Sequence, residues 1–175
     1  MKISNILKKS NKILLRELII TDFKLRYQGS ILGYTWSVLK PLFLFLILYI
    51  VFEKFLRIGK GIQHYPVYLL LGVILWGFFV ESTNNGLQAI ISRGSLIRKI
   101  NFPKYIIVIS GTVSSLINLT INLVVVMIFI VINGVHLHAE ALWAFPLILE
   151  LYAFSLAIAF FLSTLNVRFR DVGYL

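Results

Sequence analysis

Four long apolar runs dominate this sequence and restrict what the chain can fold into. They cover about residues 37–56, 65–85, 105–132 and 142–165. A helix rises about 1.5 Å per residue, so roughly 20 residues cross the ~30 Å hydrocarbon core of a bilayer. The runs do not alternate apolar and polar residues, which favours helices over the strands of a membrane barrel. The sequence therefore predicts an all-α bundle with four membrane-spanning helices.

The composition supports a membrane environment. Hydrophobic residues make up 59% of the 175 residues, whereas a soluble domain is about 45–50% apolar. A chain of this length cannot bury so much apolar surface in one water-facing core. The net charge is +10, but the basic residues stand between apolar runs, so membrane lipids rather than nucleic acid are the expected anionic partner. The absence of Cys excludes disulfides, thiol nucleophiles and Cys metal sites in this chain.

The positions of Lys and Arg predict the orientation. With a cytoplasmic N-terminus, fourteen of the seventeen basic residues lie inside, and only Lys54, Arg57 and Lys60 lie outside. The opposite orientation would invert this ratio, against the positive-inside rule. Within residues 1–20, apolar residues stand at roughly helical spacing among basic ones, which favours a helix in the membrane interface, followed by an entry loop, over a plain solvated basic helix. We therefore expect a cytoplasmic interfacial segment over 1–36 and a transmembrane domain over 37–175.

The connection between the second and third runs, residues 86–104, is expected on the cytoplasmic side. It mixes apolar residues with Arg93, Arg98, Lys99 and Lys104, which is typical of a short amphipathic helix that contacts the membrane or a cytoplasmic partner. The sequence Asn101-Phe102-Pro103 should end this helix, because a residue before proline disfavours the helical conformation.

Polar residues inside the runs are expected to hold helices together. Four of them recur every four residues on one face of the third run, and they are Ser110, Ser114, Asn118 and Asn122. Glu150 lies inside the fourth run, and a carboxylate there is expected to face a protein interior. Glu81 is nearer the inner end of the second run, so headgroup contact and an interior position both remain open.

Aromatic residues lie close to one face of each of the first two runs. They are Phe45, Tyr49 and Phe52 in the first run, and Tyr65, Tyr68, Trp76 and Phe79 in the second. An aromatic path would suit sugars, because ring faces stack on the C–H faces of pyranose rings. Interfacial belts and ordinary packing give the same pattern, and spacing alone favours these two.

The sequence holds no recognisable catalytic set. His136 and His138 stand near Glu140, but no third metal ligand approaches them on sequence grounds, and polar loop residues are the better interpretation. The stretch 59–61 lacks the spacing of a phosphate-binding loop. We therefore expect no metal, no cofactor and no enzymatic reaction on this chain.

Three segments are distinctive in their order and spacing. They are residues 22–36 (DFKLRYQGSILGYTW) with Lys40-Pro41, residues 96–104 (LIRKINFPK) and residues 166–172 (NVRFRDV). This combination resembles the permease subunit of polysaccharide-export ABC transporters, the type-2 exporter group that moves O-antigen, teichoic acid or capsule chains. The likeness covers essentially the whole chain.

The resemblance implies a homodimer in the bacterial cytoplasmic membrane, with a channel between the two copies. Each copy would dock a separate ATP-binding subunit, on which ATP is hydrolysed. The substrate would be a long glycan on a lipid carrier, usually undecaprenyl diphosphate. The family usually has six spans, and residues 171–175 read like the lead-in to a fifth, which predicts that this sequence lacks the last two.

The resemblance also implies three groups of candidate residues. The coupling segment that contacts the ATPase corresponds to Ser95, Arg98, Lys99, Asn101, Phe102 and Pro103. The cytoplasmic mouth for the lipid-linked substrate corresponds to Lys24, Arg26, Tyr27 and Trp36. The aromatics of the channel correspond to Phe45, Tyr49, Phe52, Trp76 and Phe79. Basic residues at the mouth could hold a diphosphate by charge-assisted hydrogen bonds, alongside a general attraction to anionic lipids.

Two other functions remain open. One is an ABC-type exporter of drugs or other lipids, against which the segment 26–36 argues. The other is a membrane-embedded enzyme of lipid-linked sugar metabolism, which would need an acidic or His-centred set at a membrane surface. A purely anchoring protein is disfavoured by the three segments together.

Overall fold

The computed structural model describes residues 9–27, 29, 32–57, 59, 61–99, 102–136 and 138–169. These residues form helices and turns, and none of them is in a strand. Four helical segments are long and apolar enough to cross a membrane, and they are Gly33–Phe55, Tyr65–Ser92, Tyr105–Ile132 and Ala139–Arg168. This confirms the predicted all-α bundle with four spans.

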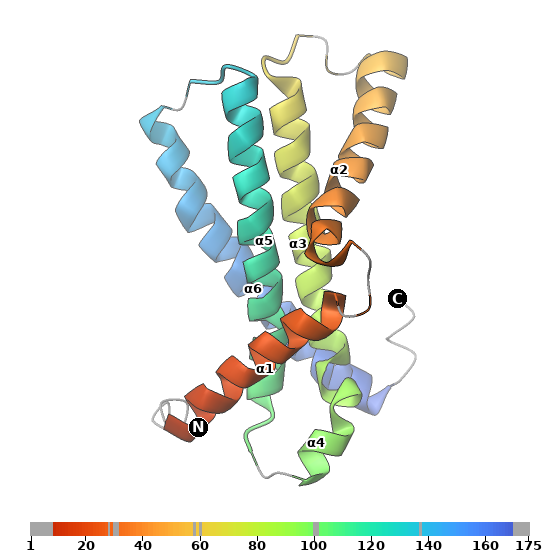
Figure 1. Cartoon of the computed structure of the whole chain (residues 1–175), viewed down its shortest axis with the longest axis vertical. Helices are drawn as coiled ribbons and strands as arrows, with labels where there is room; N and C mark the ends of the chain where they lie inside the picture. Colours follow the sequence, from red (N-terminus) through yellow and green to blue (C-terminus); the bar gives the residue numbers. More distant parts are fainter. Residues whose placement is uncertain are drawn as a thin grey trace.

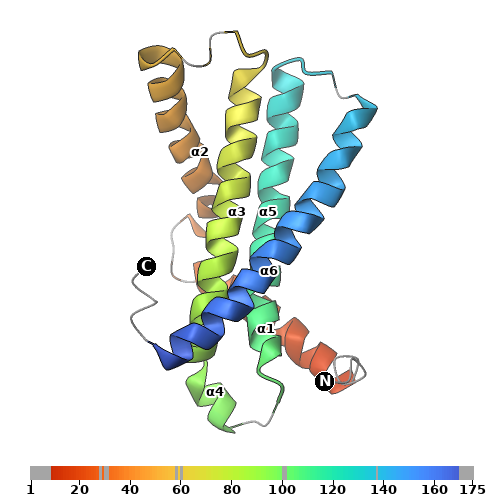
Figure 2. The ribbon, with the colours of Figure 1, turned by 180° about the vertical axis from the view of Figure 1, so that it is seen from behind.

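Two long helices form the centre of the bundle. They are α3 (Tyr65–Ser92) and α5 (Tyr105–Ile132), which run side by side. On one side of this pair lies α2 (Trp36–Tyr49). In the view of Figure 1, α6 (Ala144–Arg168) crosses behind α3 and α5, and Figure 2 shows it from the other side. The first span starts with a 3-10 turn, Gly33–Thr35, and ends with a π-helical turn, Ile50–Phe55.

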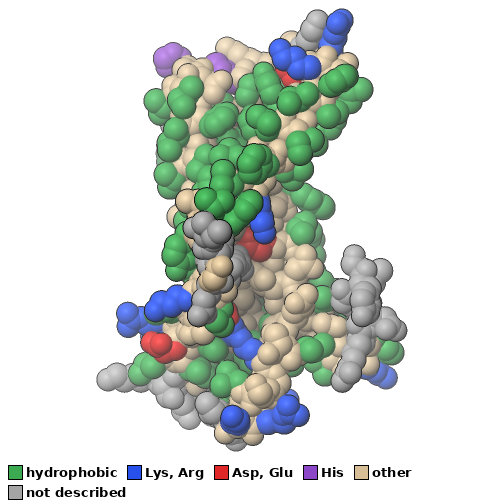
Figure 3. Space-filling view, turned by 45° about the vertical axis from the view of Figure 1, so that its right-hand side comes forward, with side chains coloured by type: hydrophobic (Ala, Val, Ile, Leu, Met, Phe, Trp, Pro, Cys, Tyr) green, Lys and Arg blue, Asp and Glu red, His purple; other side chains and the backbone are tan. Residues whose placement is uncertain are grey.

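Two further helices gather at one end of the bundle. α1 (Lys9–Tyr27) crosses the face opposite α6 at a steep angle to the spans (Figures 1 and 2). α4 (Gly94–Lys99) lies in the connection from α3 to α5. Figure 3 shows hydrophobic side chains over much of the height of the bundle, and many Lys and Arg side chains toward its two ends.

The second span is longer than the sequence predicted. α3 continues to Ser92, past the expected end near residue 85. Its 28 residues correspond to about 42 Å of helix, more than the ~30 Å hydrocarbon core. The first residues of the predicted connection, 86–92, are therefore the last turns of α3, and only Arg93 separates α3 from α4.

Apolar packing is concentrated in two clusters. The first lies at the α1 and α4 end, with Leu18, Ala89, Ile106, Ile107, Val108 and Ala159 at its centre. The second lies between α2, α3 and α5, and contains Phe45, Leu70, Ile74, Phe78, Leu119 and Val126. Lipid tails are as apolar as these side chains, so close van der Waals packing rather than exclusion of water stabilises the contacts inside the membrane.

Small residues bring α3 and α6 together. An added Cβ at Gly86 would lie 2.3 Å from the Cβ of Ala159, so only glycine permits this approach. Ser155 and Ser163, one turn to either side of Ala159, are also buried. Asn166 Nδ2 donates to the carbonyl oxygen of Leu87 at 2.8 Å. The two helices thus meet along a stripe of small residues that ends in a hydrogen bond.

Glu150, for which the sequence predicts an interior position, lies at the surface of this single chain. Glu150 is exposed on α6, a helix whose first turns diverge from α5 (Figure 2). Its neighbours Leu147 and Leu149 are exposed as well. The described helices therefore do not bury this carboxylate.

Candidate functional site

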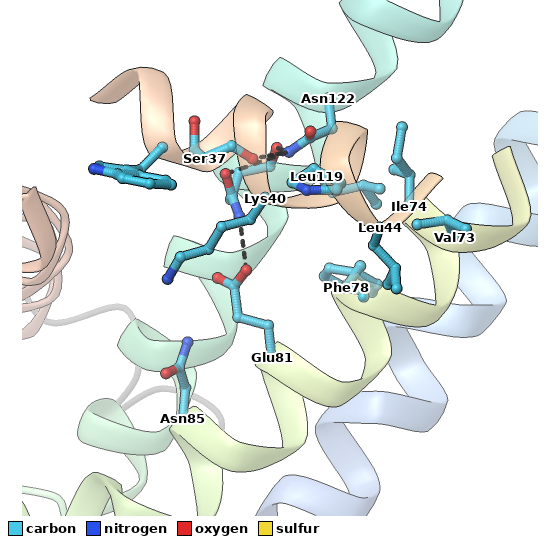
Figure 4. Close-up of a pocket in the computed structure, with 14 residues that line it drawn as sticks. Ser37, Lys40, Leu44, Val73, Ile74, Phe78, Glu81, Asn85, Leu119 and Asn122 are labelled. Atoms are coloured by element: carbon cyan, nitrogen blue, oxygen red, sulfur yellow. Dashed lines mark hydrogen bonds between the residues drawn. The ribbon is translucent and has the colours of Figure 1, made fainter. Parts of the chain in front are cut away.

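A cavity of about 660 Å³ opens between α2, α3 and α5. Its size falls in the range of small-ligand sites, roughly 300–1,000 Å³. One part of its lining is apolar and consists of Pro41, Leu44, Val73, Ile74, Phe78 and Leu119. The other part carries polar groups and a tryptophan, namely Trp36, Ser37, Lys40, Glu81, Asn85, Asn118 and Asn122 (Figure 4).

A proline of the first span lines this cavity. Pro41 lies inside α2 and has no N–H, so it cannot donate to the carbonyl oxygen of Ser37 four residues earlier. Asn122 of α5 donates to that oxygen instead, through Nδ2 at 3.2 Å. Asn122 is only 5% exposed. The unpaired carbonyl of α2 is thus satisfied by a neighbouring span.

A carboxylate faces the same cavity from α3. Asn118 Nδ2 donates to Glu81 Oε2 at 2.6 Å, a charge-assisted bond that reduces the cost of a carboxylate within a span. The Lys40 side chain extends toward the same part of the cavity (Figure 4). Of the two positions left open for Glu81, the structure shows the interior one, where it binds α5.

The polar stripe of the third span lies where the sequence predicted, against other helices. Ser110, Ser114 and Asn122 are buried, and the hydrogen bond from Asn118 crosses to α3. One further bond supports the same interface, since Asn85 Nδ2 donates to Ser115 Oγ at 2.7 Å. The interpretation of these residues as helix–helix contacts is confirmed.

The polar lining continues toward the α4 end. A second cavity of about 270 Å³ is lined by residues of α1, α3 and α5, which include Asp22, Gln88, Arg93 and Ser114. Asn85 lines both cavities. Polar residues therefore follow α3 from Glu81 to Arg93.

The residues expected at the cytoplasmic mouth are only partly brought together. Trp36 lines the large cavity, whereas Lys24 is exposed on α1 and is not part of its lining. The side chains of Arg26 and Tyr27 lie outside the described residues. The sequence did not single out Lys40 for this site, although Lys40 follows Trp36 by one helical turn and is the charged residue closest to it in the first span.

The aromatics expected in a channel fall into two separate groups. Phe45 is only 7% exposed and meets Phe129 of α5 edge-on, with ring centroids 5.5 Å apart. Trp76 and Phe79 lie on the α6 side of α3, where Phe79 stacks on Phe154 at 5.9 Å. Tyr49 belongs to the first group, because its ring stacks on Phe45 with centroids 5.8 Å apart. Tyr49 and Phe52 are both half-buried.

The residues expected to couple to an ATPase lie on and just after α4. Ser95, Arg98 and Lys99 are exposed, while Leu96 and Ile97 pack against the first apolar cluster. Phe102 and Pro103 follow as half-buried residues, and Asn101 lies outside the described residues. α4 thus turns its apolar side to the bundle and its basic side outward.

Comparison with known proteins identifies the family. Residues 13–175 match the family described as ABC-2 type transporter. Two O-antigen export system permease proteins RfbA of Klebsiella pneumoniae are 32% and 31% identical to this chain over 152 residues, which is 86% of this chain and 58% of each relative. The RfbA permease of Myxococcus xanthus is 29% identical over 166 residues, which is 93% of this chain and 62% of that protein. The chain therefore spans about three fifths of the length of these curated relatives. The chain is a multi-pass membrane protein and belongs to the ABC-2 type transporter family.

Proposed function

We propose that this protein is the membrane-spanning permease subunit of an ABC transporter that exports lipid-linked polysaccharide. The observation that carries the proposal is the similarity to O-antigen export permeases over 86–93% of the chain. This similarity favours a glycan over drugs or other lipids as the substrate. It also favours transport over an enzymatic reaction of lipid-linked sugars on this chain.

The proposal includes a second copy of the chain and a separate ATP-binding subunit on each copy. Within the described residues, α1 and α4 lie at the same end of the bundle (Figure 1). This end carries exposed basic residues, among them Lys12, Arg16, Arg98 and Lys99. By the positive-inside rule we assign this end to the cytoplasm, with α1 in the membrane interface. The outward basic side of α4 then faces the ATP-binding subunit.

We assign the large cavity to sugar units of the glycan. Lys40 and the amides of Asn85 and Asn118 supply donors, and the Glu81 carboxylate supplies acceptor oxygens, so the lining can bind hydroxyl groups both as acceptors and as donors. Trp36 adds a ring face on which a pyranose can stack.

Reconstitution tests the proposal. The permease and its ATP-binding subunit would be placed in inside-out vesicles with undecaprenyl-diphosphate-linked glycan in the outer medium. We expect glycan to become protected inside the vesicles when ATP is added, and no protection with an ATPase variant that cannot hydrolyse ATP. Transport of a drug or phospholipid in place of glycan would favour the alternative exporter. Chemical conversion of the lipid-linked sugar without the ATPase would favour the enzyme.

A further inference from the structure

Asp22, Arg93 and Ser110 form a compact polar node between three helices. Arg93 Nη2 pairs with Asp22 Oδ1 of α1. Arg93 Nη1 donates to Ser110 Oγ of α5 at 3.0 Å. The Ser110 hydroxyl lies 3.4 Å from Asp22 Oδ2 and 2.8 Å from the carbonyl oxygen of Ile107, to which it donates. One arginine thus binds both a carboxylate of α1 and a hydroxyl of α5.

The node is shielded from solvent. The side chains of Arg93 and Asp22 are 18% and 19% exposed, and Ser110 is fully buried. Partial burial lowers the pKa of the Arg93 guanidinium, but a guanidinium remains protonated at neutral pH. A charge pair in such surroundings has directional requirements that an apolar contact does not have, because a displaced partner leaves a half-buried charge behind.

Arg93 occupies a singular place in the chain. It is the one residue between the end of α3 and the start of α4, and its carbonyl oxygen accepts the hydrogen bond from the N–H of Ile97 in α4. The corner at which α3 turns into α4 is therefore also the residue that binds α1. A force on α4 reaches α1 through this side chain as well as through apolar contacts.

The apolar contacts alone leave α1 less strictly placed. Leu14, Leu15 and Leu18 of α1 pack against the first apolar cluster, to which Leu96 and Ile97 of α4 also belong. These contacts are apolar and have no directional requirement of the kind that a hydrogen bond has. The ion pair and the bond to Ser110 fix one position along α1.

We propose that Asp22 and Arg93 are positioning residues that make α1 and α4 move as one unit. This rests on the proposed function, in which an ATP-binding subunit acts on α4 and α1 lies at the membrane interface. The node transmits the movement of α4 to α1, at the second cavity, which Asp22 and Arg93 line.

A distance measurement tests the tie without requiring transport. The chain has no Cys, so spin labels can be placed at Lys12→Cys in α1 and Ser95→Cys in α4, both exposed sites. In nanodiscs, with unlabelled protein in excess, we expect one narrow distance distribution. Asp22→Asn and Arg93→Gln should at least double its width, and the swap Asp22→Arg with Arg93→Asp should restore most of the narrowing. Glu17→Gln, an exposed acid on α1, is the matched control.

Coupling is then measured in the reconstituted complex without spin labels. We expect Asp22→Asn and Arg93→Gln to retain most ATP hydrolysis but to export at least fivefold less glycan per ATP, with recovery in the swap. Arg93→Lys keeps the positive charge but loses the forked set of donors, so its glycan export per ATP should lie between those of the wild type and Arg93→Gln. It also provides a milder variant if Arg93→Gln does not fold.

The outcomes separate the two proposals. Unchanged distance widths in both Asp22→Asn and Arg93→Gln would overturn the tie. So would equal loss of ATP hydrolysis and export together with a lower melting temperature, because this indicates a purely structural role. Wild-type protein that exports no glycan, with distance widths that respond as expected, would overturn the proposed function and still support the tie.

Discussion

Asn122 of α5 replaces a backbone donor that Pro41 removes from α2. Its Nδ2 donates to the Ser37 carbonyl oxygen at 3.2 Å, the acceptor that an N–H at position 41 would satisfy in an uninterrupted helix. Two spans far apart in sequence are thereby joined at the rim of the large cavity. Asn122 thus compensates for the N–H that Pro41 lacks, and the contribution of this hydrogen bond to the free energy of unfolding can be measured.

The first prediction concerns this pair. Asn122→Leu leaves the Ser37 carbonyl without its donor, and we expect a loss of about 0.6–2 kcal/mol in the free energy of unfolding. Pro41→Ala supplies a backbone N–H, so Asn122→Leu should cost clearly less in that background. Reversible unfolding in mixed detergent gives the free energy of unfolding of the wild type, the two single variants and the double variant. An equal cost in both backgrounds would show that the asparagine does not compensate for the proline.

The second prediction concerns the contact between α3 and α6. Gly86→Ala places a Cβ 2.3 Å from the Cβ of Ala159, so the helices must separate, and we expect about 1–3 kcal/mol of destabilisation. Ala159→Gly in addition should recover part of it. Gly77 has nothing within 4 Å of an added Cβ, so Gly77→Ala is the matched control and should be neutral or stabilising by up to ~1 kcal/mol. Similar losses at both glycines would contradict the close approach.

The third prediction tests the cavity. We expect Lys40→Gln and Glu81→Gln each to reduce glycan export several-fold in the reconstituted complex, because each removes a charged partner for hydroxyl groups. ATP hydrolysis without substrate should change little. Lys12→Gln removes an exposed charge on α1 and serves as the control. Wild-type export by both cavity variants would exclude this cavity from the substrate path.

The fourth prediction concerns α4. Reversing the charge of Arg98 and Lys99 to Glu should weaken binding of the ATP-binding subunit by at least tenfold, since both side chains are exposed on the outward side of the helix. Co-purification at several salt concentrations measures the loss. Lys104→Glu, an exposed residue just before α5, is the control. A complex that survives the double reversal with unchanged coupling would remove α4 from the interface.

The span count followed from run lengths, but the end of α3 did not. The predicted connection begins at Gly86. In the structure that glycine lies within the helix and touches Ala159 of α6. A local sequence pattern cannot distinguish a glycine that ends a helix from one that permits close packing, because the difference lies in a partner from another helix.

The contacts that line the cavity could not be predicted from the sequence either. Regular spacing did reveal the polar face of α5, because a helix places every fourth residue on one side. Nothing local indicates that Asn122 meets the carbonyl before Pro41, or that Asn118 meets Glu81. These contacts depend on the depth at which three helices are aligned, which is a property of the assembled bundle.

The last prediction concerns orientation. Because the chain has no Cys, single substitutions can be labelled without background. With α4 in the cytoplasm, Cys at Ser95 should resist a membrane-impermeant maleimide in intact cells and react after the membrane is permeabilised. His136, exposed after α5, belongs to the opposite end, and Cys there should react in intact cells, as should Cys at Lys60. Labelling at Ser95 but at neither of the other sites would invert the topology and place α4 beyond the reach of a cytoplasmic ATP-binding subunit.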